Sequence, residues 1–265
     1  MRIFSHLSEA TKENERDLIE HGLRTISKTV QDKQQHFITR ELIGHVYSIP
    51  LIPPSISELK DLLTYFNYSK EEGNSIVEYI EREYRSRISQ ILPPGEIKST
   101  EPPWLAWPKR WTPFLDSSGE LAYTYYDRLR TDSQLLRCIK NLRSISIDSQ
   151  KGSGRHSRHN LAMIYRPEDA RHWGIKRVPC SLYYQFLVRE STPGIEKFYM
   201  IYNIRSMDFY KFFLVDVSIA LRIGAFISQL VMMAPHTPYV EEGAFIQITN
   251  SLHAEEKTLI ERGVF

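Results

Sequence analysis

The chain has 265 residues, 42% of them hydrophobic, and this length allows a large buried core within one domain spanning residues 1–265. The 34 lysines and arginines nearly balance 32 aspartates and glutamates, so the formal net charge of +2 gives no reason to expect nucleic acid or a membrane surface as a partner. The two cysteines are too few for a disulfide scaffold and favour a reducing compartment, the cytoplasm.

The first 70 residues alternate between helical and strand patterns. Ser8 is a candidate N-cap for a helix that runs to about Val30, because apolar residues recur there at helical spacing. Residues 37–49 alternate like a strand, which the following prolines end. Ser55 begins a helical region that breaks near residues 67–69.

The middle of the chain combines one amphipathic helix with irregular structure. The helix carries four residues on one face, Ile76, Tyr79, Ile80 and Glu83. Residues 93–111 are rich in proline and tryptophan and predict an irregular segment, whose tryptophans either anchor a loop or stack on a flat ligand. Residues 132–144 predict a helix that contains Cys138 in its apolar face, and residues 150–156 predict a basic loop.

The last 106 residues change to strand periodicity around one long helix. Strands are expected at 160–165, 181–189, 196–204 and 244–249. Residues 192–194, Thr-Pro-Gly, suit a hairpin turn between the second and third of these. Residues 212–233 are apolar enough to suggest a membrane span, but Asp216 and Arg222 interrupt them, so we expect a buried central helix instead. Strands packed by separate helices indicate an α+β fold.

Cys180 is the candidate nucleophile. It follows Pro179 at the start of a strand-like run, and a thiolate is a soft nucleophile suited to attack on an electron-poor ring carbon. Activation requires a lowered pKa, which a nearby arginine such as Arg205 or Arg158 would provide. On spacing alone, the alternative is an inert cysteine buried in a strand.

The residues around this cysteine resemble the thymidylate synthase superfamily. Residues 178–188 read Val-Pro-Cys-Ser-Leu-Tyr-Tyr-Gln-Phe-Leu-Val, and residues 202–208 read Tyr-Asn-Ile-Arg-Ser-Met-Asp. The resemblance implies a mixed sheet packed by helices, a homodimer formed through the sheet, and a cysteine that adds to C6 of a pyrimidine nucleoside monophosphate. It also implies 5,10-methylenetetrahydrofolate as the one-carbon donor and no metal ion.

The same resemblance implies a set of phosphate-binding residues. Arg205 matches the arginine that binds phosphate within the subunit, and Ser206 follows it as in the family. Residues 154–159 resemble the family segment whose two arginines reach the nucleotide of the partner subunit. Arg158 matches the first of them, whereas His159 replaces the second. Lys33 resembles the lysine of a phosphate-binding Asp-Lys pair in the phage deoxycytidylate hydroxymethylases.

The resemblance implies roles for four further residues, Glu83, Tyr125, Asp208 and His253. Glu83 matches the catalytic glutamate, and Tyr125 matches a tyrosine that assists deprotonation at C5, although Tyr123 and Tyr126 lie close to it in the sequence. Asp208 matches the aspartate near the folate.

His253 resembles the histidine that contacts the sugar 3′-hydroxyl. Two residues after it, the tyrosine expected from the family is replaced by Glu255.

Asp216 carries the substrate prediction. Methylating family members have an asparagine at this position, whereas the phage deoxycytidylate hydroxymethylases have an aspartate. A carboxylate accepts a hydrogen bond from the N4 amino group of cytosine, but facing O4 of uracil it leaves two acceptors together. Such an aspartate is also compatible with a helix N-terminus that needs a negative charge.

The resemblance therefore predicts a dCMP hydroxymethylase. The chain ends at Phe265, twelve residues after His253, and we expect this short tail to leave the intermediate open to water. Three alternatives stay open: a CMP hydroxymethylase, a dUMP or dCMP methylase of the thymidylate synthase type, and a catalytically silent nucleotide-binding homologue. We expect the protein in the cytoplasm, including the host cytoplasm if it is encoded by a phage.

Overall fold

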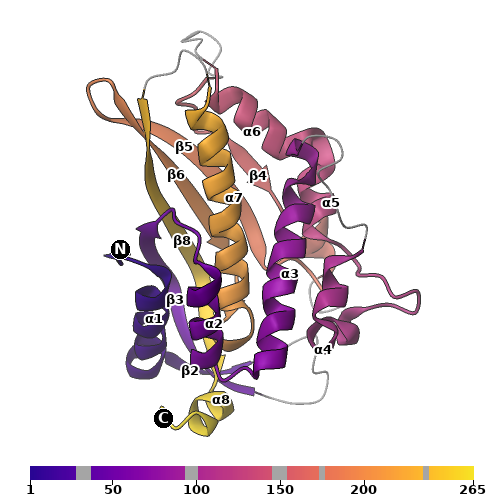
Figure 1. The fold of residues 1–265 in the computed structure, drawn as a ribbon. Helices are drawn as coiled ribbons and strands as arrows, with labels where there is room; N and C mark the ends of the chain where they lie inside the picture. Colours follow the sequence, from indigo (N-terminus) through magenta and orange to yellow (C-terminus); the bar gives the residue numbers. More distant parts are fainter. Residues whose placement is uncertain (28–36, 93–100, 145–153, 173–176, 235–238) are drawn as a thin grey trace.

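A mixed β-sheet forms the centre of the structure, a computed structural model that describes residues 1–27, 37–92, 101–144, 154–172, 177–234 and 239–265 (Figure 1). The strands are β1 (Arg2–Ile3), β2 (Leu23–Ser27), β3 (Phe37–Pro50), β4 (Leu161–Met163), β5 (Ser181–Thr192), β6 (Ile195–Ile204), β7 (Met207–Asp208) and β8 (Tyr239–Glu255). Their order is β1-β3-β8-β6-β5-β4, while β2 pairs with β3 and β7 pairs with β8. Because β6 and β8 are parallel whereas β5 and β6 are antiparallel, the predicted mixed sheet is confirmed.

Helices pack against this sheet, which confirms the α+β class. They are α1 (Leu7–His21), α2 (Ile56–Tyr65), α3 (Lys70–Ile88), α4 (Pro108–Trp111), α5 (Tyr125–Arg130), α6 (Gln134–Leu142), α7 (Leu214–Met232) and α8 (Glu256–Glu261). A π-helical turn at Phe209–Phe213 precedes α7. Short 3₁₀ turns lie at Ser89–Ile91, Pro103–Ala106, Thr112–Phe114, Thr131–Ser133 and Pro167–His172.

The predicted first helix is too long. Helix α1 begins after His6, whose ring nitrogen accepts a hydrogen bond from the backbone N–H of Glu9, and it ends at His21. Residues 23–27, expected to continue the helix, instead form β2 antiparallel to β3. The backbone N–H and C=O groups of these residues form hydrogen bonds with β3, which is a separate segment of the chain. The spacing of apolar residues within 23–27 carries no information about that pairing. Val30 lies outside the described residues.

Three other boundaries differ from the predictions. Helix α6 begins at Gln134 because Asp132 and Ser133 adopt positive φ angles of 58° and 47°. Strand β8 extends well beyond the expected 244–249, since it pairs with β3 along one edge and with β6 and β7 along the other. The segment expected to be irregular contains the short turns at Pro103–Ala106 and Pro108–Trp111.

Helix α7 lies across the sheet at the centre of the core (Figure 1). The segment Phe209–Met232 is long and apolar enough to cross a membrane, with mean hydropathy 1.7, but 72% of its most apolar window is buried inside the fold. A Cβ atom at Gly224 would lie 2.5 Å from Met200 Sδ and 2.7 Å from Leu51 Cδ1, so the helix approaches β6 closely. The predicted central buried helix is therefore confirmed.

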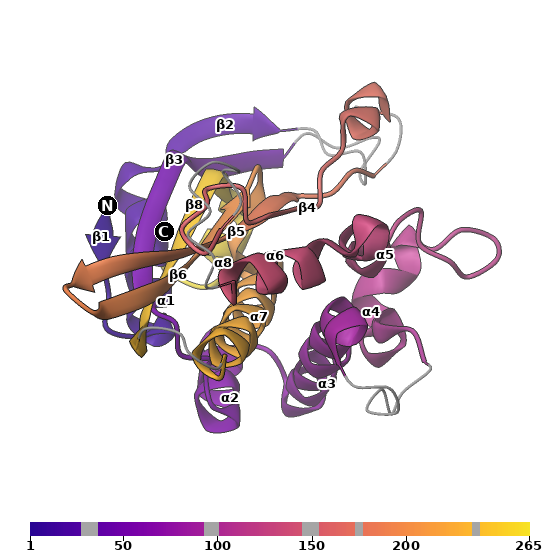
Figure 2. The same cartoon turned by 90° about the horizontal axis from the view of Figure 1, so that it is seen from above.

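Helices α2, α3 and α7 lie on one face of the sheet (Figure 2). Phe186, Met200 and Tyr202 are fully buried beneath them, and their alternate neighbours project to the opposite side. We call this side the open face. Its partly exposed residues include Val46, Gln185, Leu187, Arg189, Tyr199, Ile201, Ile246 and Ile248.

Candidate active site

Cys180 lies directly before β5 and is partly buried. Its carbonyl oxygen accepts a hydrogen bond from the backbone N–H of Arg205 at 2.9 Å. The Arg205 side chain donates to the carbonyl oxygens of Pro179, from Nε at 2.8 Å, and Val178, from Nη2 at 3.3 Å. The arginine predicted to bind phosphate thus also holds the backbone that carries the candidate nucleophile.

A buried arginine joins two of the predicted catalytic residues. Arg87, with 2% of its surface exposed, donates from Nε to Glu83 Oε1 at 2.7 Å and from Nη1 to the Tyr184 hydroxyl at 2.7 Å. Its guanidinium carbon lies 4.2 Å from the centre of the Tyr125 ring. The Tyr125 hydroxyl in turn accepts a hydrogen bond from the backbone N–H of Ser181 at 3.4 Å. Glu83 and Tyr125 are therefore held together beside the cysteine-bearing strand.

Arg87 was not among the sequence predictions. It belongs to a charged helical stretch with Arg82 and Arg85, both of which pair with glutamates at the surface. The sequence did contain one signal for Arg87: it lies four residues after Glu83, and this spacing places the two side chains on the same face of a helix.

Asp216 lies in the first turn of α7, within electrostatic reach of this network. Burial raises the pKa of its carboxyl group to about 6; Arg87 opposes the rise and the Glu83 carboxylate adds to it. A carboxyl group with this pKa exchanges a proton near neutral pH. The protonated form donates one hydrogen bond and accepts another, which matches the N3 acceptor and N4 amino donor of cytosine.

The pKa of the Cys180 thiol does not follow the sequence prediction. Burial raises it above its usual value, and the positive charge of Arg205 only partly offsets this effect. Asp216 and Asp208 act in the same direction as burial, whereas Arg177 acts with Arg205. The prediction that nearby arginines lower the pKa of the Cys180 thiol is therefore wrong. Of the two arginines proposed to activate the thiol, Arg205 lies near it.

Asp208 takes part in a charged cluster at the edge of the site. Lys211 Nζ lies 3.1 Å from Asp208 Oδ2 and also donates to Glu255. Asp208 is aligned with His253 where β7 pairs with β8. Glu255, which stands where a tyrosine was expected, is thus an ion-pair partner of Lys211. Ser206 is partly buried next to Arg205.

An aromatic surface with an arginine lies beside the cluster formed by Arg87, Glu83 and Tyr125. The Arg177 guanidinium stacks 4.7 Å from the Trp111 ring, 4.8 Å from Phe114 and 5.5 Å from Tyr123. Tyr123 stacks on Tyr125 at 6.2 Å. This surface borders a hollow of about 480 Å³ lined by Ala122, Tyr123, Asp127, Arg128, Thr131, Arg166, Glu168, Asp169 and Arg177.

Arg177 covers the ring faces of this surface, where its cation is attracted to the aromatic rings. Arg177 was missed by sequence reasoning because its contacts join segments distant in the chain. The tryptophans themselves are buried, with Trp107 1% and Trp111 7% exposed, so their main role is packing.

Two predicted phosphate ligands lie elsewhere. The Arg158 carbonyl accepts a hydrogen bond from Gln185 Nε2 at 2.9 Å, on the open face of the sheet. Gln185 is five residues beyond Cys180, roughly 17 Å along the strand. Arg158 and His159 are exposed and lie outside the network around Cys180. Lys33 lies outside the described residues.

The remaining predicted features occupy ordinary positions. Cys138 is a core residue in α6, with 3% of its surface exposed, as predicted. Tyr126 contacts Arg130 instead of the catalytic network, so Tyr125 is the tyrosine of the predicted segment that meets Arg87. Within the part of the chain that the structure describes, no group of three or more His, Cys, Asp or Glu side chains is arranged to hold a metal ion.

Comparisons with known proteins identify the fold. No protein-family model matches the sequence, and neither does any curated protein. Among solved structures, thymidylate synthase from phage T4 matches with a TM-score of 0.59 and 14% identity over 97% of this chain and 79% of that one. Thermostable thymidylate synthase A from Bacillus subtilis matches with a TM-score of 0.57 and 13% identity, covering 98% of this chain and 84% of its own.

Proposed function

We propose that this chain, which has the fold of the thymidylate synthases, transfers a one-carbon group to C5 of a cytosine nucleotide. The proposed substrate is dCMP, the proposed donor is 5,10-methylenetetrahydrofolate, and the proposed product is the 5-hydroxymethyl nucleotide. The observation that carries the proposal is the convergence of Cys180, Glu83, Tyr125 and Asp216 on one side of the sheet, from four separate segments of the chain.

Cys180 begins the proposed reaction. The thiol, whose pKa is raised by burial, first loses its proton to a water molecule. The thiolate then forms a bond from Sγ to C6 of the pyrimidine, and the electron pair of the C5–C6 double bond moves to make C5 nucleophilic. C5 then takes the methylene group from the donor. Loss of the proton from C5 and departure of tetrahydrofolate from the transferred carbon leave an exocyclic methylene on a ring that is still bound to Sγ. Water then adds to this methylene, the C5–C6 double bond re-forms, and the thiolate leaves C6. The net gain is CH₂O.

Glu83 and Tyr125 are placed to handle the protons. Both contact the Arg87 guanidinium, which holds the carboxylate and the phenol in a fixed relation. Burial raises the pKa of Tyr125 well above its usual value, so its hydroxyl remains protonated at neutral pH. Tyr125 is therefore suited to orient a water molecule or a leaving proton, and Glu83 is the candidate base.

Arg205 and Asp216 account for substrate recognition. Arg205 lies beside Cys180, and its Nη1 group, which the hydrogen bonds to Pro179 and Val178 do not use, would donate to the 5′-phosphate; Ser206 follows with a hydroxyl group. Asp216 faces the base edge: it accepts from the cytosine N4 amino group and, when protonated, donates to N3. Opposite uracil, the ionised carboxylate would leave O4 facing another acceptor, which favours cytosine.

A homodimer formed through the open face completes the proposal. Ile201, Ile246 and Ile248 lie close together on this face in the strand register and are only partly covered. A row of aliphatic side chains on a sheet without a covering helix is typical of an interface. The Arg158 carbonyl binds Gln185 on the same face, and in the proposed dimer a partner subunit would bring Arg158 toward a second active site.

Exchange of the C5 hydrogen tests the first half of the reaction without the donor. Reversible addition of Cys180 at C6 should replace the C5 hydrogen of dCMP by deuterium in D₂O, as measured by proton NMR. A Cys180→Ala variant should abolish the exchange, whereas Cys138→Ala should retain it. Equal exchange by the wild type and Cys180→Ala would contradict the role of the cysteine. A methylase would show the same exchange, and product mass separates it from a hydroxymethylase.

A further inference from the structure

A single π-helical turn, Phe209–Phe213, joins β7 to α7. Turns of this kind are rare, occur mostly as one turn within an α-helix, and are frequent at functional sites. This one begins after Asp208, whose carboxylate accepts a hydrogen bond from the backbone N–H of Lys211 at 3.1 Å. It continues directly into the first turn of α7, which carries Asp216. The π turn therefore lies between two acidic residues of the candidate site.

The π turn sets the direction of Asp216 relative to Asp208. A π turn holds one more residue than an α-helical turn, so it rotates the helix after it by about 100° relative to a continuous α-helix. Side chains eight residues apart, as these two are, lie about 80° out of line along a regular α-helix, and the extra residue reduces this angle to about 20°. Both carboxylates raise the pKa of the Cys180 thiol, which agrees with their facing the same side.

The Tyr210 side chain attaches the π turn to the first helix of the chain. Its hydroxyl donates to Glu15 Oε1 in α1 at 2.6 Å, and the two residues are buried, with 9% and 6% of their surface exposed. Burial and this hydrogen bond raise the pKa of Tyr210, so its phenol stays protonated and remains the donor. The Tyr210 carbonyl oxygen accepts a hydrogen bond from the Tyr68 hydroxyl at 3.0 Å. Tyr210 is thus fixed at both its side chain and its backbone.

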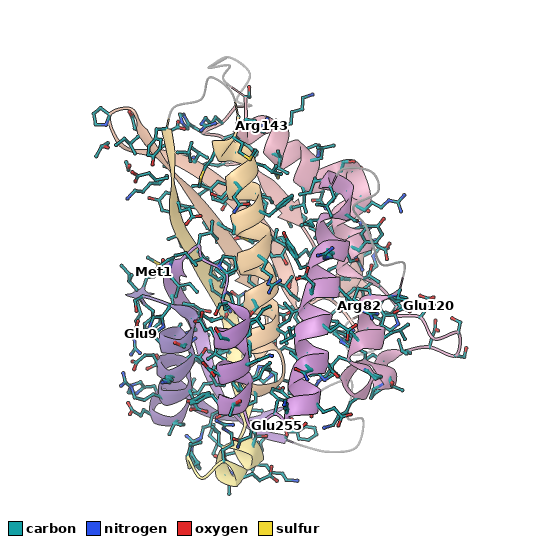
Figure 3. The ribbon with its side chains drawn as sticks, viewed as in Figure 1. Met1, Glu9, Arg82, Glu120, Arg143 and Glu255 are labelled. Carbon is teal, nitrogen blue, oxygen red and sulfur yellow. The ribbon has the colours of Figure 1, made fainter. Side chains whose placement is uncertain are left out.

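The C-terminal segment also contacts the π turn. Arg262, which follows α8, places Nη2 3.4 Å from Glu15 Oε1, and its guanidinium lies 4.8 Å from the centre of the Tyr210 ring. Glu255, directly before α8, accepts a hydrogen bond from Lys211 in the π turn. Figure 3 shows Glu255 at the bottom of the view, beside the yellow helix α8. Segments near both ends of the chain therefore meet at the π turn.

The Glu15 carboxylate has a second phenol donor, which belongs to another element. The hydroxyl of Tyr65, the last residue of α2, donates to Glu15 Oε2. The Arg262 guanidinium lies 5.4 Å from the centre of the Tyr65 ring, much as it lies against Tyr210. The two tyrosines share the same carboxylate and the same arginine, but only Tyr210 belongs to the π turn. Tyr65 is therefore a matched comparison for Tyr210.

We call Glu15, Tyr210 and Arg262 the anchor. We propose that the anchor fixes the π turn and thereby holds Asp208 and Asp216 on the side of the helix that faces the candidate nucleophile. Hydrogen bonds to a carboxylate are roughly twice as strong as those between neutral groups, which suits them to holding a rarely formed turn. The anchor residues are positioning residues, because they act through the two aspartates. Its effect on base recognition rests on the proposed function, whereas the fixed turn does not.

Alkylation of the Cys180 thiol tests the anchor without turnover. Asp208 and Asp216 both raise the pKa of this thiol, so movement of either carboxylate away from it should lower that pKa. Tyr210→Phe should therefore react with iodoacetamide at neutral pH about threefold or more faster than the wild type, with a lower pH midpoint of the rate. Tyr65→Phe should keep the wild-type rate and midpoint. Mass spectrometry of the peptide that contains Cys180 gives the rate.

A second anchor variant and the reaction itself complete the test. Arg262→Met, which leaves the tyrosines in place, should move the alkylation midpoint in the same direction as Tyr210→Phe. Tyr210→Phe should also lower the ratio of kcat/KM for dCMP over dUMP about threefold or more, because Asp216 would no longer be held toward the base edge.

Equal alkylation midpoints in folded Tyr210→Phe, Arg262→Met and Tyr65→Phe would overturn the anchor. A wild type without turnover on any nucleotide would refute the proposed function, while the alkylation midpoints would still test the anchor.

Discussion

Replacing Arg87 by methionine should destabilise the protein far more than an equivalent change at the surface. Arg87 and Glu83 are 2% and 9% exposed, and the arginine also binds the Tyr184 hydroxyl. Methionine fills similar space but leaves the glutamate carboxylate and the phenol without their donor. Breaking a buried ion pair in this way typically costs about 3 to 5 kcal/mol. For a chain of this size that loss lowers Tm by roughly 6 to 20 °C.

Arg85→Met is the matched control on the same helix. Arg85 pairs with Glu81 at 2.6 Å with the same i,i+4 spacing, but both side chains are solvent-exposed, at 47% and 38%. Exposed helical pairs contribute only about 0.3 to 0.5 kcal/mol. Urea denaturation of both variants and of Glu83→Gln/Arg87→Met measures the difference. A loss at Arg87 no larger than that at Arg85 would refute the account of this network.

Three further predictions concern the base, pH and packing. Asp216→Asn should shift the ratio of kcat/KM for cytosine over uracil nucleotides toward uracil by roughly 5- to 150-fold, and an unchanged ratio would remove Asp216 from base recognition. Because burial raises the pKa of Asp216 from 3.8 to about 6, the stabilisation it provides is complete below pH about 4 and is lost as pH rises through about 6. The Tm of the wild type relative to that of Asp216→Asn should therefore fall as pH rises from about 4 to about 6, and parallel curves of Tm against pH would disagree with it. Gly224→Ala should cost about 1 to 3 kcal/mol by denaturation, since its Cβ would contact Met200 and Leu51; an unchanged stability would mean that α7 does not approach the sheet so closely.

The sequence predicted the elements whose local residue pattern is sufficient to identify them. Residues 37–49, 181–189 and 196–204 have a strand-like pattern, and the structure contains strands there. Arg205 binds the backbone of Pro179 and Cys180, and the roles that the family resemblance implies for Cys180, Arg205 and Asp216 stay predictions. The long apolar run at 212–233 lies in the core, as the two charged residues within it implied, and Arg222 pairs there with Glu81.

The sequence was uninformative where burial depends on distant partners. Arg87 has the local pattern of a surface residue, and its burial arises from Tyr184 on β5 and Tyr125 on α5. Residues 23–27 have helical spacing, yet pairing with β3 makes them a strand. The pKa of Cys180 likewise depends on the summed effects of burial and four charged neighbours, which no single motif contains.

Mass spectrometry of the nucleotide product tests the central claim most directly. Purified protein would be incubated with 5,10-methylenetetrahydrofolate and, separately, with dCMP, CMP and dUMP, beside a Cys180→Ala control. The account predicts a gain of CH₂O on dCMP that is absent with Cys180→Ala. A gain of CH₂ would indicate a methylase, and a gain on CMP or dUMP alone would change the assigned substrate. No change on any of the three nucleotides, with a folded protein, would contradict the proposed reaction.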